Sequence, residues 1–561
     1  MQTFAKYSDV VENSADKKLL KFAFLICIIG LLCSLNLFGL IDPSDGYYPE
    51  TAREMLERGD FFTPHLAFQP FYEKPIGVYW LILASYKIFG INEFAARIPS
   101  ALSGIFCAAM VAKILRKLHL GRVGDLAAPI LMSTPLFAIV AHLSLTDMPL
   151  TACLSVAILL TFYQLFAKSS KSSNVFLINL ALGCAVLIKG PLALALYLPM
   201  CTFLLIESTF SSKERASLIN EPNGRKDKLW RILRVFSNTL FGKLSPIVGL
   251  IIIAVICCPW YIFEIQHTNG EFFKEFFLRQ HFARLNGTLN HQEPWYFYLL
   301  VYAAGTLPWT IFLFGLVAPI RRGLLTRQSM RARLIRLCIF WLITIIFLFS
   351  LSTAKLATYI VPVTVPTAIL VALAMDYLVK LKLFRQIKAT LIFSSTLMCV
   401  LLVLAVFKWS LWKDTADLSA LGISLLLAPI LITISAAYKS KKHQIYLSTT
   451  AMILSLTCTT AAFFHCYDEH RCRSLRRAYT MASNMHGSIA NFARFLPGAL
   501  FYTKRPITNL ATAEDYQAFL RNSPPPHLVV VEKNVESLIR IWCPGLEEIA
   551  DTGEYVLLQR Q

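Results

Sequence analysis

A small set of ionisable residues stands out in a chain that is otherwise mostly apolar. Lysine and arginine can hold a phosphate group and stabilise it as it leaves, arginine as a bidentate donor. Aspartate can orient or activate a nucleophile. Together these residue types suit a reaction on a lipid-linked phosphate. The candidates are Asp42, Asp45, Glu73, Lys74, Asp147, Lys189, His281, Arg284, Lys355 and Tyr359.

The elements that carry these residues are predicted to be membrane spans. Of the 561 residues, 56% are hydrophobic and 16% are charged, whereas about 25% of a soluble domain is charged. Apolar blocks are long enough to cross a bilayer, which takes about 20 helical residues. The pattern predicts an all-α polytopic membrane protein with about thirteen spans, at 19–40, 97–115, 125–142, 148–167, 174–189, 190–207, 245–266, 296–318, 337–352, 359–378, 389–407, 418–438 and 445–465.

The distribution of charge orients this bundle. The net charge is +20, which in a soluble protein would suggest a nucleic-acid partner. Membrane proteins, however, collect Lys and Arg in their cytoplasmic loops. With thirteen spans, every basic cluster falls on the side of the N-terminus. We therefore expect a cytoplasmic N-terminus, a transmembrane domain over 1–465, and a small periplasmic α/β domain over 466–561. We expect no nucleic-acid partner.

In this topology all candidate residues lie on the outer face. The two long outer loops are predicted at 41–96 and 267–295, and "PETAREMLERGD" in the first predicts an amphipathic interfacial helix with a Glu54–Arg58 pair and a stop at Gly59. Hardly any charge falls at mid-bilayer. A transporter would place its substrate groups there, so the pattern disfavours transport of a lipid-linked sugar.

Each candidate also has a simpler interpretation. In "TDMP", Asp147 or Thr146 could cap a helix, and Lys189 and Lys355 could extend to the interface. His281 could be an interfacial polar residue. A divalent cation on Glu73 and His281 is a further alternative, although no ligand spacing supports it. No other cofactor is expected.

Five segments in the same order resemble the aminoarabinose transferases of bacterial lipid A modification, which belong with protein O-mannosyltransferases among the GT-C glycosyltransferases. They are "YYPETAREMLERGDFFTPHL", "FYEKPIGVYWL…FGINEFAARIPSAL", "VLIKGPLAL", "RQHFARLNGT…HQEPWYFYLL…LPW" and "FLFSLSTAKLATYIVP". The resemblance implies the GT-C fold, a sugar donor on undecaprenyl phosphate, and inversion at the periplasmic face of the inner membrane.

The resemblance also implies roles for individual residues. Lys74, Arg284 and Tyr359 match positions that bind the polyprenyl phosphate, and Asp147 matches the second acidic site. The first acidic site departs from the usual "DE": the chain reads "DPSDGYYPETAREM". Asp45 is the preferred equivalent, and Asp42 is the alternative.

We therefore expect transfer of 4-amino-4-deoxy-L-arabinose or a similar sugar to lipid A phosphate. Asp45 and Asp147 would position or activate the nucleophile. Lys189 and Lys355 would hold an anionic acceptor, with Glu73, His281 and Asp42 in supporting positions. The alternative acceptors are a protein or another glycan.

Overall fold

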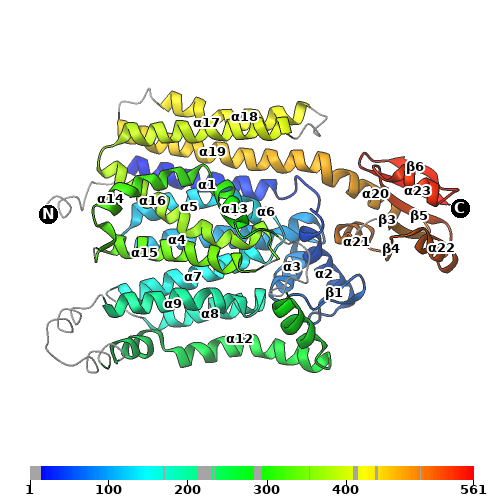
Figure 1. Ribbon diagram of the computed structural model, residues 1–561, viewed down its shortest axis with the longest axis horizontal. Helices are drawn as coiled ribbons and strands as arrows, with labels where there is room; N and C mark the ends of the chain where they lie inside the picture. The colour runs from blue at the N-terminus through cyan, green and yellow to red at the C-terminus, as the bar shows by residue number, and fades with distance from the viewer. Residues whose placement is uncertain are drawn as a thin grey trace.

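The computed structural model describes residues 14–167, 171–210, 230, 234–283, 293–326, 328–352, 354–408, 415–435, 440–492 and 495–560. Long helices lie side by side along one direction, and a smaller domain containing a sheet lies beyond one end of them (Figure 1). The helices of this bundle are α1 (Ser14–Ser34), α4 (Glu93–Lys117), α5 (Gly121–Met132), α6 (Pro135–His142), α7 (Asp147–Phe166), α8 (Ser172–Lys189), α9 (Leu192–Phe210), α12 (Pro246–His267), α13 (Phe297–Thr306), α14 (Val317–Arg321), α15 (Met330–Ser350), α16 (Thr364–Lys380), α17 (Phe384–Lys408), α18 (Thr415–Ile434) and α19 (Lys441–Tyr467).

Shorter 3-10 and π segments connect or extend these helices. They are η2 (Leu240–Leu244), η3 (Phe273–Ala283), η4 (Trp309–Leu316), η5 (Leu324–Thr326), η6 (Ala357–Val363) and η8 (Asp468–Cys472).

The chain is a multi-pass membrane protein. Eight helices of the described residues are long and apolar enough to cross a bilayer, or up to ten if each of two bent pairs counts as one span. Helices α1, α17 and α18 are outside this count, although they overlap the predicted spans 19–40, 389–407 and 418–438. The number thirteen therefore stays a prediction.

Two predicted spans are bent rather than straight. The helix predicted at 125–142 is α5 followed by α6 at 60°, and the one predicted at 296–318 is α13 followed by η4 and α14 at 98°. Proline lies at each break, Pro135 in the first and Pro308 in the second. Proline removes a backbone donor and clashes with the preceding turn, which explains why the helix does not continue straight.

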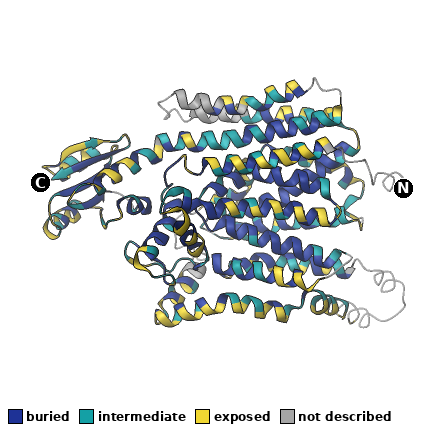
Figure 2. Cartoon of the chain, turned by 180° about the vertical axis from the view of Figure 1, so that it is seen from behind, coloured by how far each residue is buried: buried dark blue, intermediate teal, exposed yellow. Residues whose placement is uncertain are grey.

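Helix α12 forms an edge of the bundle, where exposed residues run along its length (Figure 2). Ile247, Leu250, Ile251 and Val255 are each more than half exposed. Exposed apolar side chains suit the hydrocarbon core of a bilayer. The backbone of a helix needs no solvent partner there, because its polar groups are paired within the helix.

The region between α1 and α4 packs against the small C-terminal domain instead of lying flat on the surface. It contains α2 (Ser44–Arg58), β1 (His65–Leu66), β2 (Gln69–Pro70) and α3 (Gly77–Phe89). Gly59 ends α2 in the left-handed conformation with φ 71°, as predicted. The predicted Glu54–Arg58 pair is wrong: Glu54 accepts from the Phe68 N–H, and Arg58 donates to the Phe68 carbonyl. Helices α3 and α21 pack on α2, and its carboxylates Asp45, Glu50 and Glu54 are buried, whereas Glu57 is exposed.

The C-terminal domain has the predicted α/β character. Its strands pair in the order β4-β3-β5-β7-β6, with β3 parallel to β4 and β5, and β7 antiparallel to β5 and β6. Its helices are α20 (Arg473–Ser483), α21 (Pro497–Thr503), α22 (Ala513–Asn522) and α23 (Glu536–Trp542), and its strands are β3 (Ser488–Phe492), β4 (Ile507–Leu510), β5 (His527–Glu532), β6 (Glu547–Asp551) and β7 (Tyr555–Arg560).

Candidate active site at the outer end of the bundle

Lys189 connects the ends of three helical segments. Its Nζ lies 2.5 Å from Oδ1 of Asp147, the first residue of α7, and 4.5 Å from the ring centroid of Tyr359 in η6. Lys189 and Asp147 are 8% and 5% exposed. A buried charge is costly unless it is paired, so the lysine does not extend to solvent. Thr146 precedes α7 without a side-chain cap, and the Asp147 carboxylate bonds Lys189 instead.

Tyr48 of α2 belongs to the same neighbourhood. Burial, and then the charge of Asp147, raise the pKa of Tyr48 far above its ordinary value, while a hydrogen bond with Thr146 opposes the shift. The phenol therefore stays neutral, and it can act as a hydrogen-bond donor beside the Asp147–Lys189 pair. The carboxylate of Glu73 also contributes to the raised pKa of Tyr48. The loop of residues 72–75, called the "YEKP" loop here, therefore lies near this tyrosine.

The "YEKP" loop is fixed against the end of α8 by a close backbone approach. A Cβ atom on Gly77 would lie 2.7 Å from the Leu187 carbonyl oxygen, two residues before Lys189. Only glycine permits this approach. Lys74 Nζ donates to the Glu73 carbonyl at 3.1 Å. The loop lines an open groove of about 610 Å³ together with residues of η3.

The other side of the α8 terminus contacts η3. Gly190 has φ 74°, and a Cβ atom there would meet the ring of Phe276 at 2.6 Å. The π segment that contains Phe276 leads to Arg284, which lies outside the described residues, as does the side chain of His281. The predicted phosphate-binding role of Arg284 and the Glu73–His281 cation site therefore remain predictions.

Lys355 lies in the outer connection before η6. It is 5% exposed, and its Nζ donates to the Glu293 carbonyl at 2.8 Å. Like Lys189, it is held inward by a protein partner and does not extend toward solvent.

The two alternatives for the first acidic site occupy different environments. Asp45 is 1% exposed, and its carboxylate accepts from Arg97 Nη2 at 2.6 Å and from the Ser144 N–H at 2.5 Å. It therefore fixes the segment that immediately precedes Asp147. Asp42 instead accepts from the Gly498 N–H of the C-terminal domain at 2.8 Å. The carboxylate that pairs with Lys189 among the described residues is that of Asp147.

Sequence reasoning missed Arg97, which is completely buried. Its guanidinium donates to the carbonyls of Leu35, Phe38 and Gly39 as well as to Asp45. The sequence did contain a signal for this residue, because Arg97 in "FAARIPSAL" stands at the predicted start of a span. An arginine at membrane level is energetically costly and is a functional candidate for that reason.

No group of three or more His, Cys, Asp or Glu side chains among the described residues is arranged to hold a metal ion. The described cysteines Cys466 and Cys472 are both buried, and no disulfide joins them.

Comparisons with known proteins identify similar sequences and folds. The family model of dolichyl-phosphate-mannose-protein mannosyltransferases matches residues 73–218. An undecaprenyl phosphate-alpha-4-amino-4-deoxy-L-arabinose arabinosyl transferase of Pectobacterium carotovorum is 30% identical over 363 residues, covering 63% of this chain and 58% of the relative. A similar transferase of Pseudomonas fluorescens is 28% identical over 386 residues, covering 68% and 61%. The chain thus spans about three fifths of the length of these curated relatives.

Solved structures match over nearly the whole chain. ArnT from Cupriavidus metallidurans bound to undecaprenyl phosphate superposes with a TM-score of 0.73 at 20% identity, covering 96% of this chain and 97% of that one. The apo form gives 0.78 at 18% identity, covering 97% and 98%. The predicted fold class and the predicted resemblance are confirmed: this chain has the fold of ArnT, and in sequence it is similar to the aminoarabinose transferases.

Proposed function

We propose that this protein is an inverting glycosyltransferase of the bacterial inner membrane. It moves 4-amino-4-deoxy-L-arabinose, or a similar sugar, from undecaprenyl phosphate to a phosphate of lipid A at the periplasmic face. The observation that carries the proposal is the convergence of Asp147, Lys189 and Tyr359 at one end of the bundle, beside the loop of Lys74. The names of the relatives and the bound lipid of the matching structure support the donor.

The donor lipid phosphate is held by Lys74, with Arg284 and Tyr359 as the further residues of that site. An oxygen of the acceptor phosphate attacks the anomeric carbon of the sugar while the bond to the lipid phosphate breaks. A single displacement inverts the configuration. The cations stabilise the lipid phosphate as it gains negative charge, and such a contribution is typically worth about 100-fold or more in rate.

The buried carboxylates suit a phosphate acceptor. The second pKa of a phosphate monoester is about 6, so the acceptor is already ionised at neutral pH and needs orientation more than deprotonation. Asp147 is engaged by Lys189, and in this role it holds the lysine toward the acceptor. Asp45, through Ser144, positions the start of α7, and Lys355 is a further cation for the acceptor.

A second candidate is transfer to a protein hydroxyl, which is suggested by the description of the family model over residues 73–218. A hydroxyl acceptor requires a true general base. The existing ion pair of Asp147 makes it less suited to this task, so we rank lipid A phosphate first.

The test is transfer in detergent with purified protein, lipid-linked aminoarabinose and lipid A, where no transport is possible. Lys74→Ala and Asp147→Ala should each lower kcat/KM by about 100-fold. Lys87→Ala is the matched control, because this lysine lies over the Phe61 ring at the other end of α3. Full activity in correctly folded Lys74→Ala and Asp147→Ala proteins would contradict the proposal. Mass spectrometry of lipid A and of membrane proteins identifies the acceptor.

A further inference from the structure

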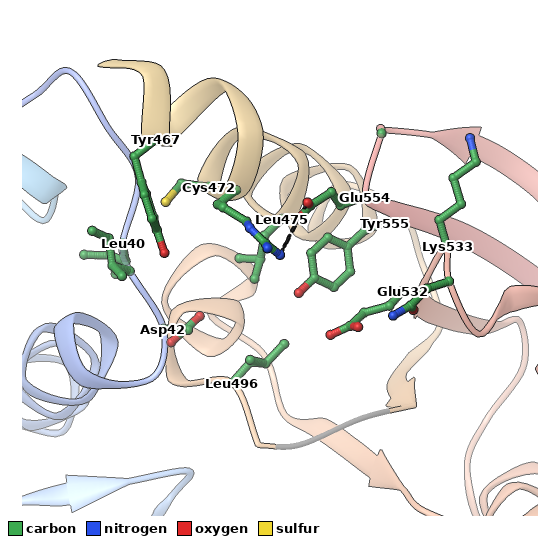
Figure 3. A pocket seen from close by; sticks show the side chains of 14 residues that line it. Leu40, Asp42, Tyr467, Cys472, Leu475, Leu496, Glu532, Lys533, Glu554 and Tyr555 are labelled. Carbon is green, nitrogen blue, oxygen red and sulfur yellow. Dashed lines mark hydrogen bonds and ion pairs between the residues drawn. The ribbon is translucent and has the colours of Figure 1, made fainter. Parts of the chain in front are cut away.

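The connection between α1 and α2, residues 35–43, passes along the C-terminal domain. Leu40 and Asp42 of this connection line a cavity of about 550 Å³ together with Cys472 and Leu496 of the domain (Figure 3). Atoms that line a cavity have fewer van der Waals partners than atoms in a closed core. The position of the connection therefore depends on specific hydrogen bonds more than on continuous packing.

The peptide unit between Gly39 and Leu40 is hydrogen-bonded on both of its sides. Its N–H, on Leu40, donates to the Tyr502 hydroxyl of the C-terminal domain at 2.8 Å. Its carbonyl, on Gly39, accepts from Nη2 of Arg97 in α4 at 2.8 Å. The N–H of Gly39 also donates to Asp468 at 2.7 Å. This peptide unit thus joins the C-terminal domain to a completely buried arginine of the bundle.

Arg97 extends the connection to the carboxylate of Asp45. Its Nη2 donates both to the Gly39 carbonyl and to Asp45 Oδ2, the latter at 2.6 Å. Its Nη1 donates to the carbonyls of Leu35 and Phe38. A planar guanidinium that is bonded to four acceptors has little freedom to rotate. Each acceptor therefore helps to fix the guanidinium and, with it, Asp45.

Asp45 in turn bonds the segment that precedes Asp147. Its Oδ1 accepts from the Ser144 N–H at 2.5 Å, and Ser144 lies three residues before Asp147, the first residue of α7. Asp147 pairs with Lys189. A continuous series of hydrogen bonds therefore runs from Tyr502 of the C-terminal domain to the segment that positions this ion pair.

The C-terminal domain also contacts the beginning of α2, which bears Asp45. The Gly498 N–H of α21 donates to the Asp42 carboxylate at 2.8 Å. A Cβ atom at Gly46 would lie 2.8 Å from the same Gly498 nitrogen, so the two helices approach each other closely at this glycine. The domain thus acts on Asp45 in two ways, through Arg97 and through the start of α2.

The Tyr502 hydroxyl suits its position because it donates as well as accepts. It donates to Glu93 Oε1 at 3.1 Å, and Glu93 begins α4, one turn before Arg97. Burial, and then the charge of Glu93, raise the pKa of Tyr502 well above its ordinary value. The hydroxyl therefore keeps its proton, and one side chain fixes both the Leu40 N–H and the beginning of α4.

We propose that Tyr502 and Arg97 are positioning residues for the transfer reaction, and that docking of the C-terminal domain holds Asp147 in its reactive position through the Gly39–Leu40 peptide and Asp45. This inference rests on the proposed function, in which Asp147 holds Lys189 toward the acceptor. It gives the C-terminal domain a task in the reaction without requiring it to touch the reacting atoms.

Hydrogen exchange in the full-length protein tests the connection without an activity assay. In Tyr502→Phe, amide exchange at residues 143–147 should become about tenfold faster, because the acceptor of the Ser144 N–H is no longer firmly held. Tyr516→Phe is the matched control, because this tyrosine belongs to the internal cluster of the same domain, and it should leave exchange at 143–147 unchanged. Unchanged exchange at 143–147 in folded Tyr502→Phe protein would overturn the proposal.

Steady-state transfer kinetics provide a second readout. Tyr502→Phe and Arg97→Lys should each lower kcat about tenfold, with KM for the lipid-linked donor unchanged. Lysine keeps a positive charge beside Asp45 but lacks the fork that also bonds the backbone carbonyls. Because the two residues act in one series, the double variant should lose no more than the weaker single variant. Losses that multiply in the double variant would indicate independent structural effects and would contradict the series.

Separate outcomes distinguish the two proposals. Absence of transfer by wild-type protein would count against the proposed function, while exchange at 143–147 would still decide whether the C-terminal domain holds this segment. Transfer by wild-type protein together with an unchanged kcat in Tyr502→Phe would overturn the positioning role and leave the proposed function intact. If Arg97→Lys does not fold, Tyr502→Phe decides the question by both readouts.

Discussion

Asp147 and Lys189 form a buried ion pair, Oδ1 to Nζ 2.5 Å, between the first residue of α7 and the last residue of α8. The two residues are 42 positions apart in sequence. The pair joins two neighbouring helices at one end of the bundle, and it places a cation and a carboxylate beside Tyr359. The opposite charges of Asp147 and Lys189 compensate each other, which allows both side chains to remain buried.

Removing one partner of this pair should be strongly destabilising. Lys189→Met leaves the Asp147 carboxylate buried without its cation, and we expect a loss of about 3–5 kcal/mol in the free energy of unfolding. Asp147→Asn combined with Lys189→Met should recover most of that stability but no transfer activity. Denaturation in detergent, followed by fluorescence, measures the first quantity.

A more exposed pair provides the control. Arg473 and Glu469 are 40% and 27% exposed, so Arg473→Ala should cost less than about 1 kcal/mol. Equal losses in Arg473→Ala and Lys189→Met would show that the buried pair has no special energetic role.

Gly77→Ala should misplace the "YEKP" loop. The new Cβ would come within 2.7 Å of the Leu187 carbonyl oxygen, so α3 must move away from α8 and carry Lys74 with it. A shift of about 1 Å can cost about 100-fold in rate. Steady-state kinetics with varied donor should show the loss. Gly242→Ala, where a Cβ would meet nothing within 4 Å, should leave the kinetics unchanged, and similar losses in both variants would refute the positional explanation.

The stability of the α2 region should fall as pH rises toward neutrality. Burial raises the pKa of Glu50 from 4.5 to about 7, opposed by its hydrogen bonds with Arg53 and reinforced by Glu54. The folded state keeps this proton while the unfolded state loses it, so the stabilisation is complete below pH 4.5 and is lost as pH rises to about 7. The loss is at most about 3 kcal/mol.

Unfolding temperatures of wild type and Glu50→Gln, compared from pH 4.5 to 8, test this sign. The difference between the two proteins should grow in favour of the variant as pH rises and then level off above about 7. A difference that moves in the opposite direction would mean that the ion pair with Arg53, and not burial, controls the titration of Glu50.

Tyr502→Phe should loosen the C-terminal domain. The hydroxyl accepts from the Leu40 N–H and donates to Glu93 at 3.1 Å, so its removal leaves both groups without this partner and should cost about 1–3 kcal/mol. Hydrogen exchange at residues 39–45 should become faster. Tyr516→Phe, in the internal cluster of the same domain, should leave exchange in that loop unchanged. Slow exchange in Tyr502→Phe would exclude this contact as the anchor.

The sequence by itself predicted the class of the fold. Long apolar blocks and the distribution of basic clusters predicted a helical membrane bundle followed by a small domain, because bilayer thickness and the cost of buried charge act on composition directly. Local backbone conformation was also predictable from the sequence, as at Gly59, which ends α2 in the left-handed conformation.

Contacts between segments that are distant in the sequence could not be predicted from the sequence in this way. Asp45 and Arg97 lie 52 positions apart, and Asp42 meets Gly498 across 456 positions. The "PETAREMLERGD" helix was misread as a surface helix, because amphipathic spacing does not reveal that α3, α21 and β1 pack on it.

The sequence therefore determined which residue types lie together at one end of the bundle, whereas the tertiary structure decided which of them meet. Periodicity fixes the face of one helix, but the partner of a side chain depends on how neighbouring helices pack and where they end. Lys189 meets Asp147 because α7 begins where α8 ends. The approach of Gly77 to Leu187 then brings the loop of Lys74 to the same place.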